Sequence, residues 1–277
     1  MLKIGQRNQL VVKEIFPLAY SLTALKGDDE SEVQLKDTDI TLTQGQKVDA
    51  FVYTLADGSL AASLASPKAE AGQFAAMVLM GASTHGYFFD WGIKPDLYMP
   101  ETQAHTDLDI GSTYVVRVVF DKAGKVIGTT KIERFLEDDG SDLTSQQQVD
   151  LLIYGQTPLG YKAIVNNRYQ GLLYKSDLIT SISIGQSLSG YIKHIRDDGK
   201  LDLSLQLQNQ DTRTSLSQAI IDDLEAHDGM STLTDKSSPE EIFARFKVSK
   251  AAYKKAIGSL YKSRKIRIEK NCLYLQQ

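Results

Sequence analysis

The sequence predicts a multidomain, mainly β chain in which three small β-barrels in tandem precede an α+β domain. Two observations carry this prediction. A repeat of short alternating strands fills the first two hundred residues, and helical spacing replaces it from residue 212. The length of 277 residues allows about two to four small domains. Hydrophobic residues make up 42% and charged residues 24%, which is the balance of a globular protein.

Three segments of the repeat align, and each runs in the same order. About eight residues alternate as in a half-buried strand, a tight glycine turn follows, and a second short strand returns. The segments are ITLTQGQKVDAFVYTLADGSLAASL (40–64), TDLDIGSTYVVRVVFDKAGKVIGTT (106–130) and TSISIGQSLSGYIKHIRDDGKLDLSL (180–205). Their turns at Gly58, Gly124 and Gly199 are hairpin signals. Units 66 and 74 residues apart can each hold a core, which favours barrels over a solenoid.

The residues after 212 predict three helices and a hairpin. Apolar residues at helical spacing mark helices over 215–230, 237–246 and 250–264, and KIRIEKNCLYLQ (265–276) alternates as a hairpin. The second helix opens with a serine cap, a proline and two glutamates. In the third helix, the residues expected to face inward are Ala252, Ala256, Ile257, Leu260 and Tyr261. Three helices and a hairpin, with a tight junction between the second and third helices, indicate a winged helix-turn-helix domain.

Two signatures in the third unit resemble those of a known barrel. GLLYKSDL (171–178) and DDGKLDLSL (197–205) resemble the two most recognisable strands of the S-one-type RNA-binding domain, a five-stranded OB-fold barrel. In the second unit, GYFFDWGIKPDLYMPE (86–101) stands where the second and third strands belong. The first unit keeps only the final hairpin clearly. We therefore predict OB-fold, S-one-like domains over 1–68, 69–137 and 145–210, and a winged-helix domain over 212–277.

The order of these domains resembles the bacterial conserved virulence factor B (CvfB) family, and SPEEIFARFKVSKAAYKKAIGSLYKSRKI (238–266) adds to the likeness. The resemblance implies RNA binding and regulation of gene expression, with bases stacked on the second and third strands of a barrel. Alternation puts Tyr87, Phe89 and Trp91 on one strand face and Phe88 on the other. One set can fill the barrel while the other lies on its outer wall. The alternative for each ring is a core or domain-interface contact.

The candidate RNA-binding residues are rings of the second and third units together with cations. Lys125 and Lys200 follow the turn glycines, where the family carries a cation for phosphate; the first unit has Ser59 there and an acidic DDESE (28–32). Tyr174 replaces a histidine common in the family, and Met99 replaces it in the second unit. Residues 243–270 hold ten basic residues and one acid. The candidates are Tyr87, Phe88, Phe89, Trp91, Tyr98, Lys125, Tyr161, Arg168, Tyr174, Arg196, Lys200, Lys250, Lys254, Lys255, Lys262, Arg264, Lys265 and Arg267.

Several classes of function lack support in the sequence. One cysteine, Cys272, excludes a disulfide framework and a thiolate metal site, and there is neither a phosphate-binding loop nor a nucleophile elbow. No apolar run approaches the ~20 residues of a membrane span, and no secretory signal is seen. We expect a cytosolic, non-catalytic binder of single-stranded RNA without cofactor or metal. The rivals are a DNA-binding transcription regulator, a ribosome-associated or protein-interaction adaptor, and an unrecognised nuclease.

Overall fold

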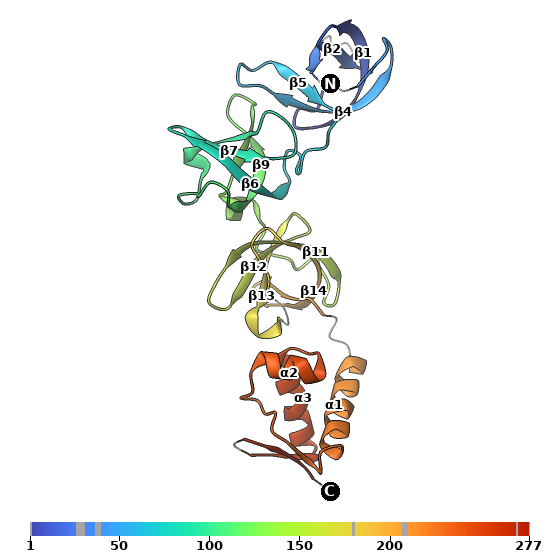
Figure 1. Ribbon diagram of the computed structural model, residues 1–277, viewed down its shortest axis with the longest axis vertical. Helices are drawn as coiled ribbons and strands as arrows, with labels where there is room; N and C mark the ends of the chain where they lie inside the picture. The colour runs from blue at the N-terminus through green and yellow to red at the C-terminus, as the bar shows by residue number, and fades with distance from the viewer. Residues whose placement is uncertain are drawn as a thin grey trace. The chain divides into compact units, whose positions relative to one another are not determined.

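The computed structural model describes residues 2–25, 31–36, 40–178, 181–206, 210–269 and 271–276, and only the backbone of 210–214. The chain divides into two compact units, Met1–Phe135 and Leu136–Gln277. The first unit holds two barrels, and the second holds a third barrel and the winged-helix domain (Figure 1). The predicted fold class is thereby confirmed. Part of the acidic stretch predicted at 28–32 lies outside the described residues.

Barrel 1 is a closed barrel with the strand order β1-β2-β3-β5-β4. Its strands are β1 (Gln6–Phe16), β2 (Ala19–Ala24), β3 (Val33–Leu35), β4 (Lys47–Thr54) and β5 (Leu60–Ser63). A parallel pairing of β3 with β5 closes it. Leu10, Leu22 and Val52 fill the interior because alternate residues of a strand point to the same side.

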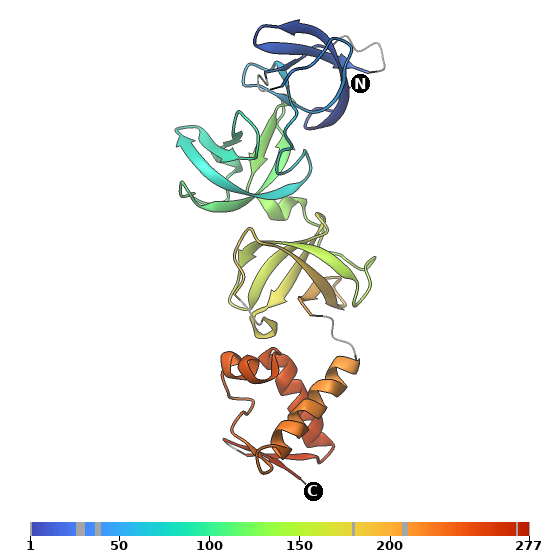
Figure 2. The same cartoon turned by 45° about the vertical axis from the view of Figure 1, so that its right-hand side comes forward.

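Barrel 2 is a curled five-stranded sheet with the order β10-β9-β6-β7-β8 (Figure 2). Its strands are β6 (Phe74–Ser83), β7 (Gly86–Asp90), β8 (Leu97–Pro100), β9 (Thr113–Phe120) and β10 (Val126–Thr129), with 3-10 turns η1 (Glu101–Gln103) and η2 (Ile132–Phe135). β8 and β10 lie side by side, but within the described part of the chain no ladder joins them. Gly86 permits the tight start of β7, since a Cβ there would lie 2.3 Å from the Met99 carbonyl oxygen.

Barrel 3 repeats the closed order of barrel 1, as β11-β12-β13-β15-β14. Its elements are β11 (Gln148–Gln156), β12 (Gly160–Val165), β13 (Tyr169–Tyr174), η3 (Lys175–Asp177), β14 (Ser187–Ile195) and β15 (Leu201–Ser204). The buried Tyr169 hydroxyl donates to Asp142 at 2.6 Å, which ties the preceding segment to the barrel. That hydrogen bond raises the pKa of Tyr169 to about 12.

The winged-helix domain packs three helices against a three-stranded sheet of order β16-β18-β17. Its elements are α1 (Gln210–Glu225), β16 (Met230–Ser231), α2 (Pro239–Phe246), α3 (Lys250–Lys262), β17 (Ile266–Ile268) and β18 (Leu273–Leu275). Tyr253 is the largest fully buried side chain; it stacks on Phe246 at 5.3 Å and donates to the Leu233 carbonyl at 2.9 Å. Burial raises the pKa of Tyr253.

Barrels 1 and 2 share one hydrophobic core within the first unit. Trp91 of barrel 2 meets Phe51 and Tyr53 of barrel 1 edge-on, with ring centroids 5.5 and 6.0 Å apart. The Trp91 indole N–H donates to the Pro95 carbonyl at 2.8 Å, and the Tyr53 hydroxyl donates to the Lys94 carbonyl at 2.7 Å. The two barrels are therefore one packed body, and Trp91 lies at its centre.

Trp91→Ala is expected to destabilise the first unit by about 3–5 kcal/mol, because it removes a fully packed ring and leaves a cavity between two barrels. Hydrogen exchange of β4 and β7 amides in a urea titration reports this unit separately from the second. The control is Phe88→Ala on the same strand, where a partly exposed ring is lost and less than about 1 kcal/mol is expected. Equal losses in the two variants would contradict the shared core.

Candidate nucleic-acid interface

Phe88 on β7 and Tyr98 on β8 form an aromatic pair on the outer wall of barrel 2. They face each other across the ladder, with ring centroids 5.5 Å apart and planes inclined by 45°. Phe88 is 36% exposed and Tyr98 is half-buried. The Tyr98 hydroxyl donates to the His85 carbonyl at 2.9 Å, which holds the ring against Gly86. Each ring of the pair has a flat, apolar face of the kind on which bases stack.

The other rings of β7 face inward, so two predicted contacts are wrong. Strand alternation holds, but Phe89 is 0% exposed and Trp91 is 2% exposed. Both rings belong to the shared core of the first unit and cannot reach a base. Tyr87 is half-buried and leans on the same core. Met99, predicted to replace a family histidine, is also buried in this core.

Lys125, predicted as a phosphate contact, joins the two barrels of the first unit. Its ammonium group donates to the Ala56 carbonyl of barrel 1. Beside it, the Val126 amide donates to the Thr54 hydroxyl at 3.0 Å. Lys125 therefore positions the barrel 1 turn against barrel 2.

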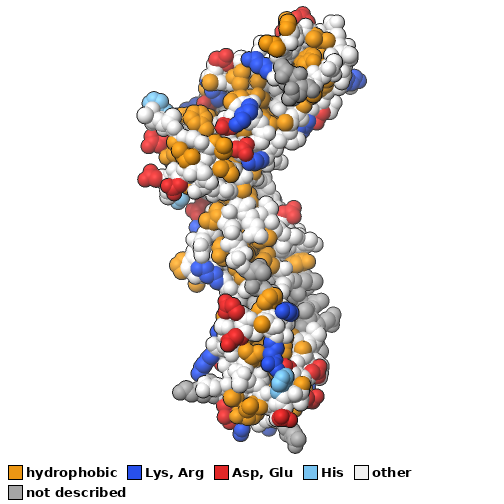
Figure 3. Space-filling model, in the orientation of Figure 1, with side chains coloured by type: hydrophobic (Ala, Val, Ile, Leu, Met, Phe, Trp, Pro, Cys, Tyr) orange, Lys and Arg blue, Asp and Glu red, His pale blue; other side chains and the backbone are white. Residues whose placement is uncertain are grey.

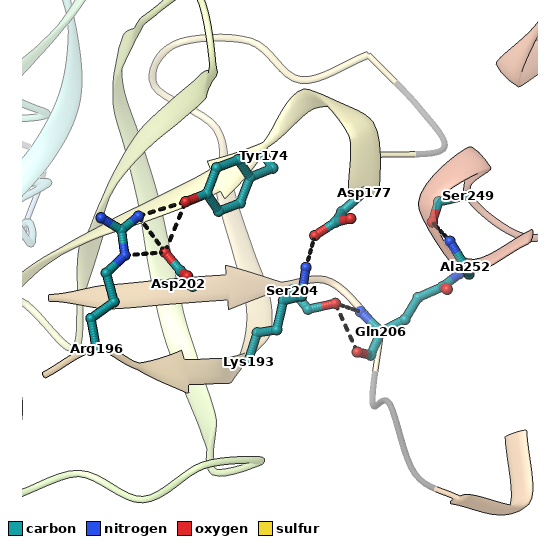
Figure 4. A network of polar contacts seen from close by, with 9 residues as sticks. All are labelled: Tyr174, Asp177, Lys193, Arg196, Asp202, Ser204, Gln206, Ser249 and Ala252. Atoms are coloured by element: carbon teal, nitrogen blue, oxygen red, sulfur yellow. Dashed lines mark hydrogen bonds and ion pairs between the residues drawn. The ribbon is translucent and has the colours of Figure 1, made fainter. Parts of the chain in front are cut away.

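Tyr174, Arg196 and Asp202 form a hydrogen-bonded cluster on barrel 3 (Figure 4). The Arg196 guanidinium donates to Asp202 from Nε at 3.0 Å and from Nη2 at 2.7 Å. Its Nη2 also donates to the Tyr174 hydroxyl at 2.5 Å. The bonds to Asp202 raise the pKa of Arg196. The cluster fixes the ring of Tyr174 by its hydroxyl end, while Asp202 offsets the charge of Arg196.

Lys193 is a residue of this surface that sequence reasoning missed. Its ammonium group pairs with Asp177, whose side chain is 5% exposed, and lies 5.7 Å from the centroid of the Tyr174 ring (Figure 4). A cation at this distance is attracted by the negative face of the ring. Asp177 belongs to the GLLYKSDL signature, but no local signal connects it with a lysine sixteen residues later.

Tyr161 lines a cleft of about 560 Å³ between barrel 3 and α2. Lys175 of η3 stands on the same wall, and Phe243 and Lys247 of α2 stand on the other. The Lys247 ammonium group lies 5.1 Å from the centroid of the Phe243 ring. Two aromatic residues, two lysines and the acidic Glu240 thus line one cleft in the second unit. Of these five residues, only Tyr161 belongs to the predicted set.

Arg168 and Lys200 are exposed cations that already have acidic partners. Arg168 contacts Glu137 at 2.8 Å and Asp142 at 3.4 Å, and it lies over the Tyr169 ring. Lys200 pairs with Asp198 at 2.9 Å. Exposed pairs are weak, so Lys200 can exchange its partner for a phosphate at small cost. Arg168 has three partners and clamps the segment before barrel 3. On the face that Figure 3 shows, acidic and basic side chains of the barrels are mixed, without one continuous basic patch.

The winged-helix domain carries the densest group of exposed cations. They lie on α3, just after it and on β17, as predicted, and all except the half-buried Lys250 are exposed. Lys254 lies 4.0 Å from Asp235, and Arg267 pairs with Glu269 at 3.0 Å. Among the described residues no ion pair engages the other members, which are Lys250, Lys255, Lys262, Arg264 and Lys265. We call the full set of seven residues the basic face.

The charges of α3 do not follow the helix dipole, which favours acids at a helix start and bases at its end. α2 follows it: Glu240 and Glu241 lie in its first turn, and Glu241 completes a capping box with Ser238. The backbone hydrogen bond from Ser238 lowers the pKa of Glu241. α3 has no acid in its first turn and begins with Lys250. The helix dipole therefore gives no reason for lysines in the first half of α3.

Arg264 ends α3 in a conformation that usually belongs to glycine. Its φ is 57°, in the left-handed region. The Lys265 amide donates to the Leu260 carbonyl, and the Arg264 amide donates to the Tyr261 carbonyl, each at 3.0 Å. These two bonds make a Schellman cap. A non-glycine residue at this position costs about 1 kcal/mol.

Tyr261 lies on the outer surface of α3, which corrects the prediction that it faces inward. Its side chain is 56% exposed. Tyr253 takes the core position instead, eight residues earlier. Eight residues carry a helix about 80° past two full turns, so two such residues do not share a face.

Two classes of site are absent from the described part of the chain. No group of three histidine, cysteine or acidic side chains there could hold a metal ion. None of the helices described is both long and apolar enough to cross a membrane.

Two domain families match this chain. Residues 4–65 match the S1 domain, which is the S-one type, and residues 218–275 match the CvfB-like winged helix domain. The first match covers the barrel in which the sequence showed only one clear hairpin.

Relatives match over almost the full chain. The Bacillus subtilis protein called uncharacterized protein YitL is 23% identical over 280 residues, covering 98% of this chain and 93% of that protein. Conserved virulence factor B of Staphylococcus saprophyticus is 25% identical over 276 residues, covering 95% and 92%. A crystal structure described as a multidomain protein with nucleic acid binding domains, from Streptococcus pneumoniae, has a TM-score of 0.43 at 22% identity and covers 99% of this chain and 98% of that chain. The resemblance to the conserved virulence factor B family, predicted from the sequence, is therefore confirmed over nearly the whole chain.

Proposed function

We propose that this chain is a non-catalytic, cytosolic RNA-binding protein that regulates gene expression. Its four modules are 1–68, 69–137, 145–210 and 212–277. Single-stranded RNA binds to rings of the second and third barrels and to the basic face of the winged-helix domain. The observation that carries the proposal is the basic face. Among the described residues no ion pair engages five of its seven cations, and Lys250 lies in the first turn of α3, where the helix dipole disfavours a cation.

The exposed rings favour a single strand over a duplex. Phe88 and Tyr98 offer flat apolar surface, and stacking on such surface needs the face of an unpaired base. A duplex covers the faces of its bases and presents only edges and phosphates. The S-one type of the first barrel and the signatures of the third support RNA as the strand.

Barrel 3 adds a second stacking position and a cleft. Tyr174 is fixed by Arg196 and stands beside the Lys193 ammonium group, so a base on this ring would have a cation close to its phosphate. The cleft between Tyr161 and Phe243 offers rings and ammonium groups in the same combination. Each of these sites is weak alone, and their presence in one chain raises the effective concentration of RNA at the others.

Barrel 1 has a supporting role in this proposal. Its turn carries Ser59 where the other two barrels have lysine, and the neighbouring Ala56 carbonyl is occupied by Lys125. Its core continues into barrel 2 through Phe51 and Tyr53. Barrel 1 therefore stabilises barrel 2, and the Phe88–Tyr98 pair stays on the outer wall of barrel 2.

The regulatory part of the proposal rests on the staphylococcal relatives, which are named conserved virulence factor B. A cytosolic location follows from the proposed partner, since regulated RNA is found there. The second candidate is a DNA-binding regulator, which the winged helix favours because its third helix can enter a major groove. Fluorescence anisotropy with single-stranded RNA and with duplex DNA at matched salt separates the two. The proposal predicts tighter binding to RNA, and tighter binding to duplex DNA would replace it with the second candidate.

The double variant Lys255→Glu, Lys262→Glu is expected to weaken binding to single-stranded RNA at least tenfold, which is about 1.4 kcal/mol. The slope of log affinity against log salt should become shallower by about 0.7 for each lost phosphate contact. Lys200→Glu should have a smaller effect, because Asp198 already offsets its charge. Lys47→Glu, an exposed charge reversal on barrel 1, is the control and should change neither quantity. Equal losses in the control and the double variant would show a net-charge effect without a site.

Arg264→Gly is expected to change stability and binding in opposite directions. Glycine adopts the left-handed cap without strain, so the winged-helix domain should gain up to about 1 kcal/mol of unfolding free energy. RNA affinity should fall severalfold because a cation of the basic face is lost. Thermal unfolding and anisotropy on the same preparation measure both. A more stable variant with unchanged affinity would remove Arg264 from the interface.

A further inference from the structure

Tyr261 is an exposed ring in the middle of the basic face, with no role in the packing of its domain. The core of the winged-helix domain contains Tyr253, Ala256, Ile257 and Leu260 from α3, but not Tyr261. Residues three and four apart share a helix face, so Lys254, Gly258 and Tyr261 form one row, with Lys262 beside it. The row carries a ring and cations but no acid.

Gly258 leaves the surface beside this ring open. It lies in the interior of α3, its φ is not positive, and a Cβ there would meet nothing within 4 Å. Neither backbone conformation nor packing therefore requires glycine, although glycine lowers the stability of a helix interior. Helical side chains lean toward the preceding turn, so the Tyr261 ring extends over the turn that contains Gly258. The missing side chain gives a flat ligand access to the ring and to the helix surface.

We infer that Tyr261 stacks on an unpaired base while Lys254 and Lys262 contact the phosphates on either side of it. In this arrangement α3 contacts single-stranded RNA directly through its outer surface. The winged-helix domain does not insert α3 into the groove of a duplex. A ring on the outer face of a helix in a duplex groove would meet base edges and phosphates, whereas an unpaired base offers its whole face. This inference rests on the proposed RNA binding and names the structural class of RNA that the winged helix recognises.

Tyr261→Ala in the full chain tests the inference. One stacked base contributes enough that its loss should lower affinity for a single-stranded RNA about 5- to 150-fold. Affinity for an RNA duplex containing the same sequence should stay within about twofold. The salt slope should not change, since no charge is removed. Because the ring is exposed, the thermal midpoint of the variant should match that of the unaltered chain, and this is checked first.

Two matched variants separate stacking from other effects. Tyr261→Phe keeps the ring and should keep the affinity; a loss as large as that of Tyr261→Ala would mean that the hydroxyl group makes the contact and would overturn the inference. Gly258→Leu should stabilise α3 and cover the ring, so it should weaken single-strand binding without harming the fold. Unchanged single-strand affinity in either Tyr261→Ala or Gly258→Leu would also overturn it.

The outcome is distinguishable from failure of the proposed function. If the Lys255→Glu, Lys262→Glu variant binds RNA more weakly while Tyr261→Ala does not, the basic face binds RNA and only the stacking inference is wrong. If both bind as tightly as the unaltered chain, the winged helix is not an RNA site, and both statements fail.

Discussion

A small barrel must give one face of every strand to its own core, and this constraint decides which rings of the protein meet solvent. On β7 the inward face carries Phe89, and Trp91 continues that face into the core shared with barrel 1. Phe88 is left on the outer face, opposite Tyr98. The burial of Trp91 thus does two things: it joins the two barrels and sets the orientation of the one aromatic pair through which we propose that barrel 2 binds RNA.

The cations of the barrels and those of the winged helix are used differently. On the barrels, Lys125, Arg168, Lys193 and Arg196 each hold a carbonyl or a carboxylate of the same unit. These contacts fix turns and rings in place. On α3 the lysines have few such contacts. Lys250 in the first turn is disfavoured by the helix dipole, whereas Lys262 in the last turn is favoured by it. A chain of net charge -4 can therefore still have a local basic surface that attracts a polyanion.

The sequence predicted most of the fold because each element has a local signal. Glycine turns, strand alternation and the caps of α2 are local, and the structure contains them where they were expected. Alternation also grouped Tyr87, Phe89 and Trp91 correctly on one face. It could not tell which face is inward, because that depends on barrel 1 residues such as Phe51, far away in the sequence.

The errors in the site have the same origin. The contact between Lys125 and Ala56 joins two domains, and nothing in either hairpin indicates it. The pairing of Lys193 with Asp177 is equally non-local. Tyr261 is predicted to face inward with the apolar residues of α3, but its side chain is exposed and Tyr253 occupies the core. The spacing of apolar residues predicts the presence of a helix more reliably than it predicts which residues lie at the edge of its buried face.

The central claim is that exposed rings of separate modules, together with the basic face, bind single-stranded RNA. Ultraviolet crosslinking of the full chain to cellular RNA, followed by identification of the attached peptides, tests it most directly. The account predicts crosslinks in the peptides that contain Phe88 and Tyr98, Tyr174, and Tyr261. Crosslinks confined to barrel 1, or an absence of crosslinks under conditions that label a known RNA-binding protein, would contradict it.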